Sequence, residues 1–288
     1  MEMLDTRFLE YQSLLELIAI AAVIMLVLTV AETLWDFARK ERTDYGETAA
    51  NVGIYIVNTL LERTLYGSLL VIVLYGFEQL RPYQLPHSWW AMALAVLAAD
   101  FTYYWMHRCE HEIRILWAYH SVHHSSPEYN LTTALRLAWV EGLFEWVFFI
   151  PMILIGFDVV QTVMGLIIVV IYQTWIHTQK IGKMGWLDKV FNTPSVHRVH
   201  HGKNPQYIDK NYGGILIIWD RMFSTYEPEV EEVEFGVTEP SGSVNPIKVN
   251  FYEFWQTIKD ARQAKNGRHA IGYFLKPPGW KPRDGNDK

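Results

Sequence analysis

The chain has 288 residues, of which 50% are hydrophobic and 15% aromatic, while only 19% are charged. An ordinary soluble domain carries about 25% charged residues, so this composition indicates contact with lipid. The net charge of -6 gives no overall basic character for a nucleic-acid partner. The single cysteine, Cys109, excludes an internal disulfide and any zinc site of the CxxC type.

Five apolar stretches follow one another along the chain and predict the spanning helices of an all-α integral membrane protein. They cover residues 17–31, 49–77, 89–106, 137–156 and 159–179, and a spanning helix needs about 20 apolar residues. The second stretch contains Glu62 and Arg63, which would have to face the protein interior or pair. Only Gly156, Phe157 and Asp158 separate the last two stretches, which predicts a hairpin, either fully spanning or re-entrant.

Basic residues indicate the orientation of these helices. Arg39, Arg108 and Lys180 follow the first, third and fifth stretches, so the positive-inside rule places those ends in the cytosol. We therefore expect residues 1–178 to form a multi-pass bundle that holds the histidines of 107–124 at its cytosolic end. Residues 179–288 would form a cytosolic cap and tail. The membrane would be the bacterial inner membrane or the endoplasmic reticulum.

Eight of the 11 histidines fall in three clusters, HRCEH, HSVHH and HRVHH. They are His107, His111, His120, His123, His124, His197, His200 and His201. Neutral imidazole binds iron, zinc, copper and nickel, and eight rings are too many for one ion but enough for two. The spacings i, i+3 and i+4 let each cluster present its rings from one helical turn. The sequence therefore predicts a two-metal site, with His177 as a ninth ligand and His87 and His269 solvated.

Two carboxylates accompany the first cluster. Asp100 lies seven residues before His107, two helical turns up the same face, where it could hold a ligating ring through its other nitrogen. Glu112 follows His111 and could be a ligand or a proton-handling group. The alternatives for both are an ion pair with Arg108 or Arg136, or a charge on the helix surface.

The donor set favours iron over zinc. A structural zinc site needs four ligands and usually contains sulfur, whereas eight or nine imidazoles without thiolate suit two ions of higher coordination. Two irons that activate O2 would explain a site at the membrane boundary, within reach of a lipid tail. Zinc could still occupy the site in a purified sample.

Two features of the C-terminal part have simpler interpretations. The acidic segment 227–239 is expected to be a solvated loop. Residues 251–263 could form a helix with Phe254, Trp255 and Ile258 on one face, packed against the cap or lying on the membrane surface.

Longer strings carry a resemblance to a known family. DFTYYWMHRCEHE at 100–112, HHSSPEYNLTTALR at 123–136 and WIHTQKIG at 175–182, with the histidine spacing, resemble the fatty acid hydroxylase and sterol desaturase superfamily of membrane di-iron oxygenases. The match covers residues 97–228. The resemblance implies a membrane bundle with a cytosolic histidine-rich cap, two irons held by the eight clustered histidines, His177 near the metals, and Glu112 as a functionally important acid.

The strings are most similar to those of the ether-cleaving members, in which tetrahydrobiopterin supplies the electrons. Two positions differ, because Gln179 stands where these relatives tend to have Glu, and Ser224 replaces a usual glycine. The chain has no HPGG-type haem motif and no dinucleotide fingerprint after a predicted strand, so the resemblance implies a separate electron donor.

The leading hypothesis is an O2-dependent di-iron monooxygenase that inserts oxygen into a C–H bond of a membrane lipid, with an alkylglycerol ether as the first substrate to consider. The alternatives are a sterol or fatty-acyl desaturase or hydroxylase, a divalent-metal transporter, and a scaffold with a stabilising metal site. Transporters place their ligands near the bilayer midplane, whereas these clusters follow the predicted spans. The oligomeric state is left open.

Overall fold

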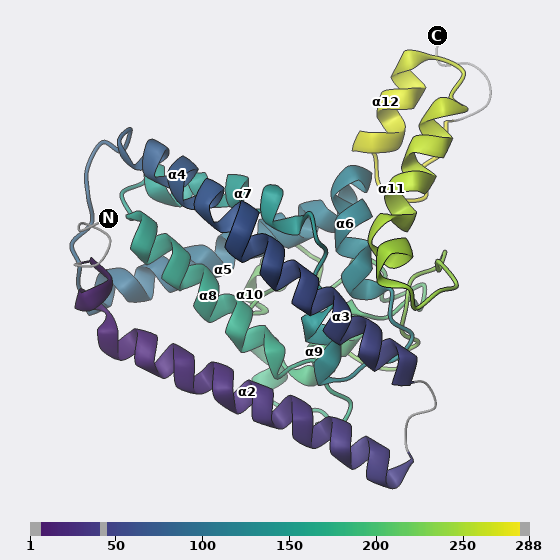
Figure 1. The fold of residues 1–288 in the computed structure, drawn as a ribbon, viewed down its shortest axis with the longest axis horizontal. Coiled ribbons are helices and arrows are strands. Elements are labelled where there is room, and N and C mark those ends of the chain that lie inside the picture. Colours follow the sequence, from purple (N-terminus) through teal and green to yellow (C-terminus); the bar gives the residue numbers. More distant parts are fainter. Residues whose placement is uncertain (1–6, 41–44, 283–288) are drawn as a thin grey trace.

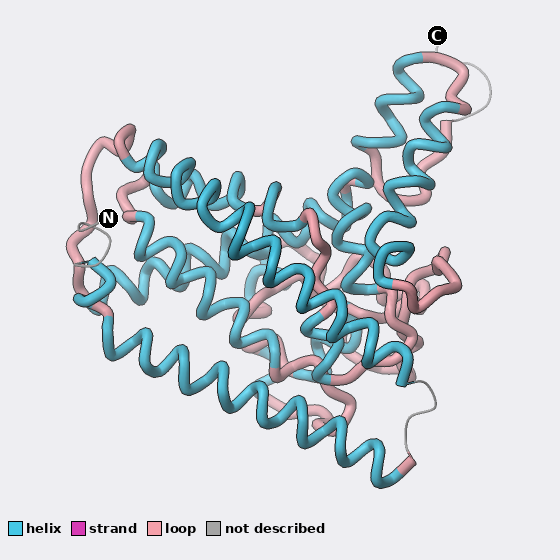
Figure 2. Tube along the Cα trace, in the orientation of Figure 1, coloured by secondary structure: helices cyan, strands magenta, loops and turns pink. Residues whose placement is uncertain are grey.

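The computed structural model describes residues 7–40 and 45–282, apart from the side chains of 68–71. Within these ranges the chain is helical and has no β-strand, only isolated bridges between Phe191 and Leu216 and between Gly202 and Phe235. Figure 2 shows helices joined by loops over the whole described part. The predicted all-α class is confirmed for these residues.

Helix α2 (Gln12–Arg39) lies along one side of the bundle (Figure 1). It has 28 residues, about 42 Å of helix, and exposes Leu17, Ile20, Val23 and Leu26. Among the described residues it is the one helix long and apolar enough to cross a membrane. The first predicted span therefore lies inside a helix that fits it.

The inner side of α2 contacts the region of the histidine clusters. The buried carboxylate of Glu32 accepts hydrogen bonds from the backbone N–H of Leu131, at 2.6 Å, and from the hydroxyl of Thr178, the residue after His177. A charged group in an apolar helix is expected to face protein. Glu32 therefore fixes the candidate membrane helix to the candidate metal site.

The second predicted span is interrupted by a π-helical turn. Helix α3 (Tyr45–Leu61) passes through Glu62–Tyr66 into α4 (Gly67–Glu78). Glu62 and Arg63 lie in the turn and their side chains are exposed, so the expectation that they face the interior is wrong. The extra residue of a π turn shifts the register of the helix face. Gly67 permits this turn, since a Cβ there would lie 2.7 Å from the carbonyl oxygen of Glu62.

Helices α5 (Trp89–Glu112) and α8 (Val159–Thr174) pack closely at the centre of the bundle. A Cβ added at Gly165 would lie 2.9 Å from the carbonyl oxygen of Ala95, so the two backbones nearly touch. Ala99, Met106 and Val169 are buried in the same cluster. The result is a close-packed support for the first histidine pair, which occupies the last turns of α5.

The fourth apolar stretch does not form one long helix. It contains a 3₁₀ turn (Glu141–Leu143) and α7 (Trp146–Leu154), whose nine residues are about 14 Å long. The hydrocarbon core of a bilayer is about 30 Å thick. The prediction that the first helix of this hairpin could cross the membrane fully is therefore wrong. The hairpin itself is present, because Gly156 adopts φ 109° and the side chain of Asp158 caps α8.

The C-terminal part adds α9 (Pro194–His200), α10 (Ile218–Met222), and a hairpin of α11 (Pro246–Arg262) and α12 (Gly267–Leu275) that projects from the bundle (Figure 1). Helix α11 packs against α6 (Arg114–His124), and Arg114 pairs with Glu253 at 2.9 Å and Asp260 at 2.8 Å.

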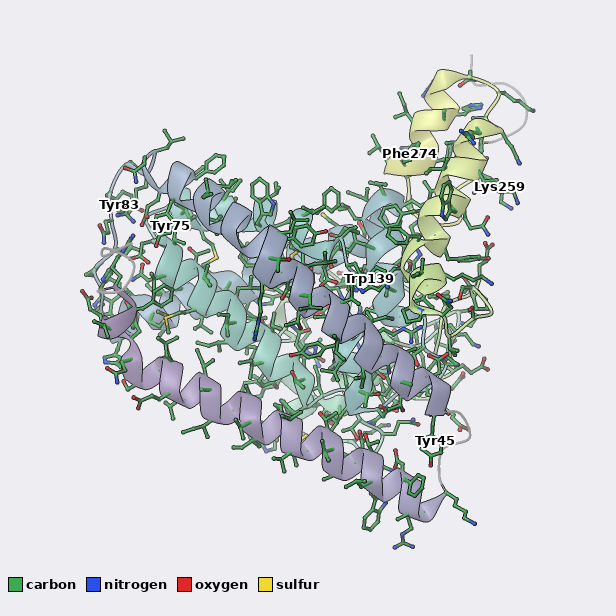
Figure 3. The ribbon with its side chains drawn as sticks, in the orientation of Figure 1. Tyr45, Tyr75, Tyr83, Trp139, Lys259 and Phe274 are labelled. Atoms are coloured by element: carbon green, nitrogen blue, oxygen red, sulfur yellow. The ribbon has the colours of Figure 1, made fainter. Side chains whose placement is uncertain are left out.

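Phe254 and Trp255 do not share a face of α11 as predicted. Phe254 packs inward against the core, whereas Trp255 is 67% exposed. Trp139 lies at the foot of this hairpin (Figure 3), and its backbone N–H donates to the side chain of Asn250 on α11 at 2.9 Å. Helix α11 thus packs against α6 and Trp139, which belong to the predicted membrane part, and the prediction that it packs against the cap does not describe these contacts.

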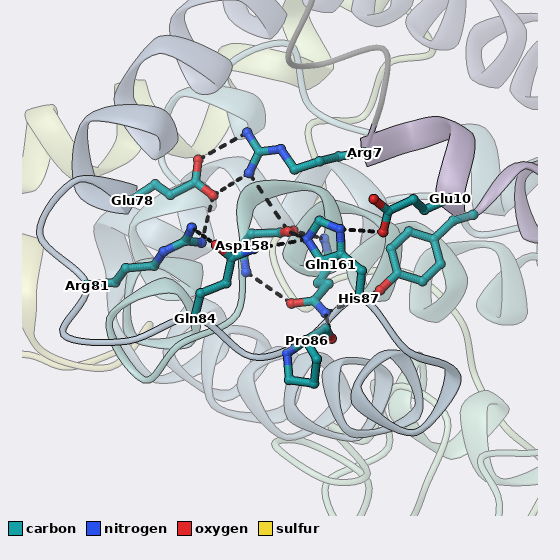
Figure 4. A network of polar contacts seen from close by, with 10 residues as sticks. Arg7, Glu10, Glu78, Arg81, Gln84, Pro86, His87, Asp158 and Gln161 are labelled. Carbon is teal, nitrogen blue, oxygen red and sulfur yellow. Dashed lines mark hydrogen bonds and ion pairs between the residues drawn. The ribbon is translucent and has the colours of Figure 1, made fainter.

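A polar network lies at the other end of α5 from the histidine clusters (Figure 4). The Nδ1 atom of His87 is 2.7 Å from a carboxylate oxygen of Glu10, and its Nε2 contacts Asp158. The His87 side chain is only 12% exposed, so the expectation that it is solvated is wrong. His269 is also partly buried, beside the ring of Trp280.

Candidate metal centre

Nine buried histidines from four segments converge into two groups. The first, the five-histidine group, contains His107, His111, His120, His124 and His200; the second, the four-histidine group, contains His123, His177, His197 and His201. In each group one ligand nitrogen from every ring lies within 4.8 Å of the others. The structure thus brings together all the histidines named as ligands from the sequence, His177 included.

Each HxxHH cluster is shared between the two groups. His120 and His124, four residues apart on α6, belong to the five-histidine group, while His123 belongs to the other. The third cluster is divided in the opposite sense, with His197 and His201 in the four-histidine group and His200 in the five-histidine group. Residues at i+3 and i+4 lie on opposite sides of residue i around the helix, about 100° from each other. Each of these two clusters therefore contributes histidines to both groups.

The spacing of the ring nitrogens matches ligands around an ion. Neighbouring Nε2 atoms within a group are 3.0 to 3.2 Å apart, as in the pairs His107–His120 and His177–His197. Two nitrogens bound at about 2.1 Å to one ion stand about 3.0 Å apart at a right angle and about 3.4 Å apart at the tetrahedral angle. The spacing therefore favours coordination numbers above four.

The outer nitrogens of three rings are held by the backbone. Their Nδ1 atoms donate to carbonyl oxygens at 2.7 to 2.9 Å: His107 to Tyr212, His177 to Gln173 and His200 to Lys210. A neutral imidazole carries one N–H, so the Nε2 atom of each of these rings directs a lone pair into its group. This arrangement is the usual outer contact of a metal-binding histidine.

Burial keeps these rings neutral. Desolvation lowers the pKa of His120, His124 and His197 well below the ordinary value of 6.5. The Nε2 atom of His111 is buried and makes no hydrogen bond, which in a protein interior costs about 1–3 kcal/mol. Neutral rings with inward lone pairs are the ligand form that a metal ion requires. The residues present fit two ions.

Sequence reasoning missed Glu110, which contacts a candidate ligand directly. Its Oε2 atom is 3.2 Å from Nδ1 of His120, and its Oε1 accepts the hydroxyl hydrogen of Tyr119 at 2.9 Å. Glu110 is 1% exposed. The sequence held one signal for it, because Glu110 lies three residues after His107 and therefore on the same side of α5.

We expect Glu110→Gln to weaken metal binding about 10- to 100-fold, the usual effect of losing an outer contact to a ligand. Burial raises the pKa of Glu110 to about 8, and the amide of glutamine is a weaker acceptor for the His120 N–H than the ionised carboxylate. A chelator competition on purified protein measures the affinity. Tyr119→Phe, which removes only the hydroxyl, should have the smaller effect, and an unchanged affinity in Glu110→Gln would contradict the assignment.

Asp100 does not hold a histidine ring. Its carboxylate accepts hydrogen bonds from the backbone N–H of Ile215 at 2.6 Å, the N–H of Leu216 at 3.2 Å and Nε1 of Trp219 at 2.9 Å. The expected contact from Asp100 to His107 is replaced by the Tyr212 carbonyl, three residues before Ile215. Two helical turns separate Asp100 from His107, and the loop fills that space. Asp100 therefore anchors the loop that holds the ring.

Glu112 lies outside both histidine groups. Its Oε1 atom accepts a hydrogen bond from Nε of Arg108 at 2.8 Å, and its side chain is 42% exposed. This ion pair was one of the alternatives weighed from the sequence. The geometry gives no support for direct metal ligation by Glu112, because the last turn of α5 points the side chain away from the rings.

The acidic segment 227–239 is not simply a solvated loop. Glu229 accepts two hydrogen bonds from Arg198, at 2.9 and 2.8 Å, and one from Ser195 at 2.7 Å. Burial opposes the charge of Glu229, but these hydrogen bonds prevail and lower its pKa below 4.5. Arg198 lies between His197 and His200 and also donates to the carbonyl oxygen of Thr178 at 3.0 Å. The segment thus ties α9 to the loop of His177.

The two positions that depart from the ether-cleaving pattern have defined local surroundings. The amide of Gln179 donates to the carbonyl oxygen of Tyr129 at 2.9 Å, a bond that an ionised glutamate could not make. Tyr129 lies over His201, with ring centroids 5.0 Å apart. Ser224 has φ 63°, the left-handed region that glycine adopts more readily.

The nine buried imidazoles thus give this helical protein two adjacent groups that could each hold a metal ion. Comparison with known proteins shows which family has a similar sequence. Residues 92–225 match the model of the fatty acid hydroxylase family, and these residues contain both groups. The part of the chain that carries the candidate metal ligands is thus similar to the fatty acid hydroxylase family.

Similar proteins include the alkylglycerol monooxygenases. The chain is 37% identical over 290 residues to that of Xenopus tropicalis, covering 96% of this chain and 63% of the relative. It is 43% identical over 210 residues to that of Homo sapiens, covering 73% of this chain and 47% of the relative. The chain thus spans about half to two thirds of the length of these relatives.

A more distant relative is an ornithine lipid hydroxylase of Rhizobium tropici, 31% identical over 170 residues, which cover 53% of this chain and 49% of that protein. No solved structure matches the chain.

Proposed function

We propose that this protein is a membrane-bound, O2-dependent di-iron monooxygenase that inserts oxygen into a C–H bond of a lipid. The observation that carries the proposal is the pair of histidine groups, whose ring nitrogens are 3.0 to 3.2 Å apart and directed inward. The match of residues 92–225 to the fatty acid hydroxylase family and the monooxygenases among the relatives support the same reaction class.

The five-histidine group would hold one iron and the four-histidine group the other, and together the bound irons would supply the O2 chemistry. The chain supplies the surroundings. The Tyr212 and Lys210 carbonyls fix two rings of the five-histidine group, and Asp100 acts through the Tyr212 loop as a positioning residue. Met106, Met164 and Val169 are buried in a close-packed apolar cluster next to the first histidine pair, which would exclude water from that side of the centre.

The substrate is proposed at two levels. The coarser level is a lipid, which both groups of relatives share in their names. The finer level is an alkylglycerol ether, with ether cleavage following hydroxylation, as the alkylglycerol monooxygenases suggest. A fatty-acyl or sterol hydroxylase or desaturase is the alternative within the same chemistry.

We further propose a multi-pass membrane protein with the histidine groups on the cytosolic side, in the bacterial inner membrane or the endoplasmic reticulum. Residues 1–178 would form the membrane part and 179–288 the cap. Helix α2 supports membrane contact by its length and outward apolar face. The electrons would come from a separate donor, with tetrahydrobiopterin as the first to test.

The direct test uses purified, iron-loaded protein in detergent with O2, a reductant and either an alkylglycerol or a fatty-acyl lipid. We expect about two irons per chain, O2 consumption that depends on lipid, and a fatty aldehyde when the ether is the substrate. Metal transport across vesicles without lipid-dependent O2 consumption would overturn the proposal in favour of a transporter. Full cellular function in a metal-free variant would favour a scaffold.

The role of Glu112 can be separated from that of its ion pair. If Glu112 handles protons, Glu112→Gln should lower the turnover rate at least about tenfold, since general acid–base groups contribute 100-fold or more. Arg108→Gln breaks the same ion pair but keeps the carboxyl, so it should have little effect on turnover. Equal losses in the two variants, measured as initial rates of lipid oxidation, would mean that Glu112 only pairs with Arg108.

A further inference from the structure

The C-terminal hairpin of α11 and α12 exposes an apolar face. Ile271 and Leu275 on α12 are each 60% exposed, and Phe274 is half-buried. These positions are spaced i, i+3 and i+4, so they lie on one side of the helix. Arg268 and Lys276, both exposed, stand before and after them. An apolar face accompanied by cationic residues is typical of a helix that lies in the surface of a membrane.

The hairpin is fixed to the helix that carries three of the candidate ligands. The backbone N–H of Arg114, at the start of α6, donates to the carbonyl oxygen of Lys276 at 3.1 Å. The guanidinium carbon of Arg114 lies 5.8 Å from the ring centroid of Tyr273, and its nitrogens pair with Glu253 and Asp260 on α11. The orientation of the hairpin is therefore set by α6 and, through α6, by the bundle.

Helix α2 gives the level of the histidine groups in the proposed membrane arrangement. Glu32 lies seven residues before the end of α2 at Arg39, which is about 10 Å of helix, and it contacts Thr178 beside His177. The helix length of about 42 Å exceeds the hydrocarbon core, about 30 Å thick, by about 12 Å. When α2 enters the core at its first turn, the histidine groups lie near the level at which it leaves the core.

The hairpin projects on the histidine side of the bundle and runs across the direction of α2 (Figure 1). Helix α12 lies to the left of α11 in this view, on the side of α4. Phe274 on α12 and Lys259 on α11 lie on opposite sides of the hairpin (Figure 3). A helix that runs across a spanning helix is parallel to the bilayer surface. The exposed face of α12 would therefore meet the lipid beside the bundle.

The outer face of α11 is the competing surface. Trp255 is 67% exposed there, and it shares this face with Lys248, Gln256 and Lys259. Lys259 points to the side of the hairpin away from α12 (Figure 3). Because the hairpin is fixed to α6, placing this outer face on lipid would turn the membrane part of the bundle away from the bilayer. The position of the hairpin therefore favours α12.

We propose that α12 lies in the surface of the leaflet on the histidine side, with Ile271, Phe274 and Leu275 among the acyl chains and its two flanking cations on anionic headgroups. This proposal rests on the proposed membrane placement and adds a second lipid contact outside the spanning helices. Because α12 is bonded to α6, the contact would hold the candidate metal centre at the level of the headgroups.

The test measures the depth of single residues in the full chain, reconstituted in lipid nanodiscs. In a Cys109→Ala background, which leaves the chain without cysteine, an environment-sensitive fluorophore is attached at Ile271→Cys or Lys259→Cys. Spin-labelled lipids carry the quencher near the headgroup or near the methyl end of the acyl chain. We expect the Ile271→Cys probe to be quenched more by the first, since interfacial helices bury their apolar face about 5–10 Å deep. Lys259→Cys is the matched control and should escape quenching.

A reference probe separates this proposal from the membrane placement on which it rests. Val23→Cys, on the exposed side of α2, should be quenched most by the label near the methyl end. If Val23→Cys is quenched and Ile271→Cys is not, α12 faces water or a protein, and only the α12 proposal is wrong. If Ile271→Cys is quenched and Val23→Cys is not, α12 binds lipid and the membrane placement is wrong. Quenching of Lys259→Cys in place of Ile271→Cys would overturn the proposal in favour of α11.

The headgroup preference has its own test. Arg268→Gln with Lys276→Gln should reduce the quenching of the Ile271→Cys probe in nanodiscs that contain phosphatidylglycerol, because cationic side chains near the surface attract anionic lipid. The same change should leave the quenching unaltered in pure phosphatidylcholine. Equal quenching with and without the two cations in both lipids would overturn the assignment of anionic headgroups. Metal content equal to that of the wild type shows that each labelled variant is folded.

Discussion

His200→Ala is expected to remove one metal ion per chain and to lower lipid oxidation more than about 100-fold. Loss of an outer contact to a metal ligand already weakens metal affinity or activity about 10- to 100-fold, and loss of a ligand itself should weaken them further. His200 belongs to the five-histidine group, although His197 on the same helix and His201 at its C-cap belong to the other. The ion of the four-histidine group should therefore remain.

His123→Ala is the reciprocal variant. It lies beside His124 on α6 but belongs to the four-histidine group, so it should deplete the opposite ion with an equal loss of activity. The double variant should be no less active than either single one, since groups that act as a unit have non-additive effects. Metal content per chain and O2 consumption measure both effects.

His269→Gln is the control for these variants, because His269 lies in α12 outside both groups and should keep both ions. Two ions per chain and an unchanged rate in His200→Ala would contradict the assignment. Depletion of the same ion by His123→Ala and His200→Ala would contradict the division of the clusters between two centres.

Local spacing was enough to predict the candidate ligands but not their division. The pairs four residues apart, such as His120 with His124, stay together in the structure, because the helix alone sets their common face. His123 and His200 each belong to a different group from the other histidines of their own cluster. The remaining members of their groups come from other segments of the chain. That information lies in the packing of α6 against α9 and the His177 loop, which no local pattern contains.

The errors have a similar origin. Asp100 has the spacing for a contact with His107, but the loop after α9 intervenes and its backbone makes the hydrogen bonds. The spacing of Glu110 from His107 places it on the same side of α5, but its partner His120 comes from α6 and is known only from the packing of the two helices. The length of an apolar stretch does not show whether it forms one continuous helix. Residues 137–156 contain a 3₁₀ turn at Glu141–Leu143 before the short helix α7. Hydrophobicity predicts burial or lipid contact, whereas helix length also depends on turns and prolines.

Arg136→Met is expected to destabilise the protein by about 3–5 kcal/mol, the range for removing one partner of a buried ion pair. Arg136 is 1% exposed, and it donates to Glu47 at 2.8 Å and Asn51 at 2.7 Å on α3. Its Nε also donates to the carbonyl oxygen of Val122 at 2.9 Å, directly before His123. The substitution leaves the carboxylate of Glu47 buried without its cation.

The double variant Glu47→Gln with Arg136→Met separates two effects on stability. One is the unpaired buried charge of Glu47, and the other is the loss of the hydrogen bonds that the guanidinium group of Arg136 donates. It should recover part of the stability, because an uncharged amide is far less costly to bury than a carboxylate. Recovery should be incomplete, since the Val122 carbonyl still loses its donor. Thermal unfolding in detergent gives the ranking, with Arg136→Met lowest and the double variant between it and the wild type.

Metal content then shows whether Arg136 supports the centre as well as the fold. If the Val122 contact positions His123 and His124, both Arg136 variants should bind metal more weakly even where they remain folded. Arg136→Lys keeps the charge but not the planar fork, so it should restore stability better than metal affinity. Equal metal affinity in all three folded variants would limit Arg136 to joining α3 with the end of α6.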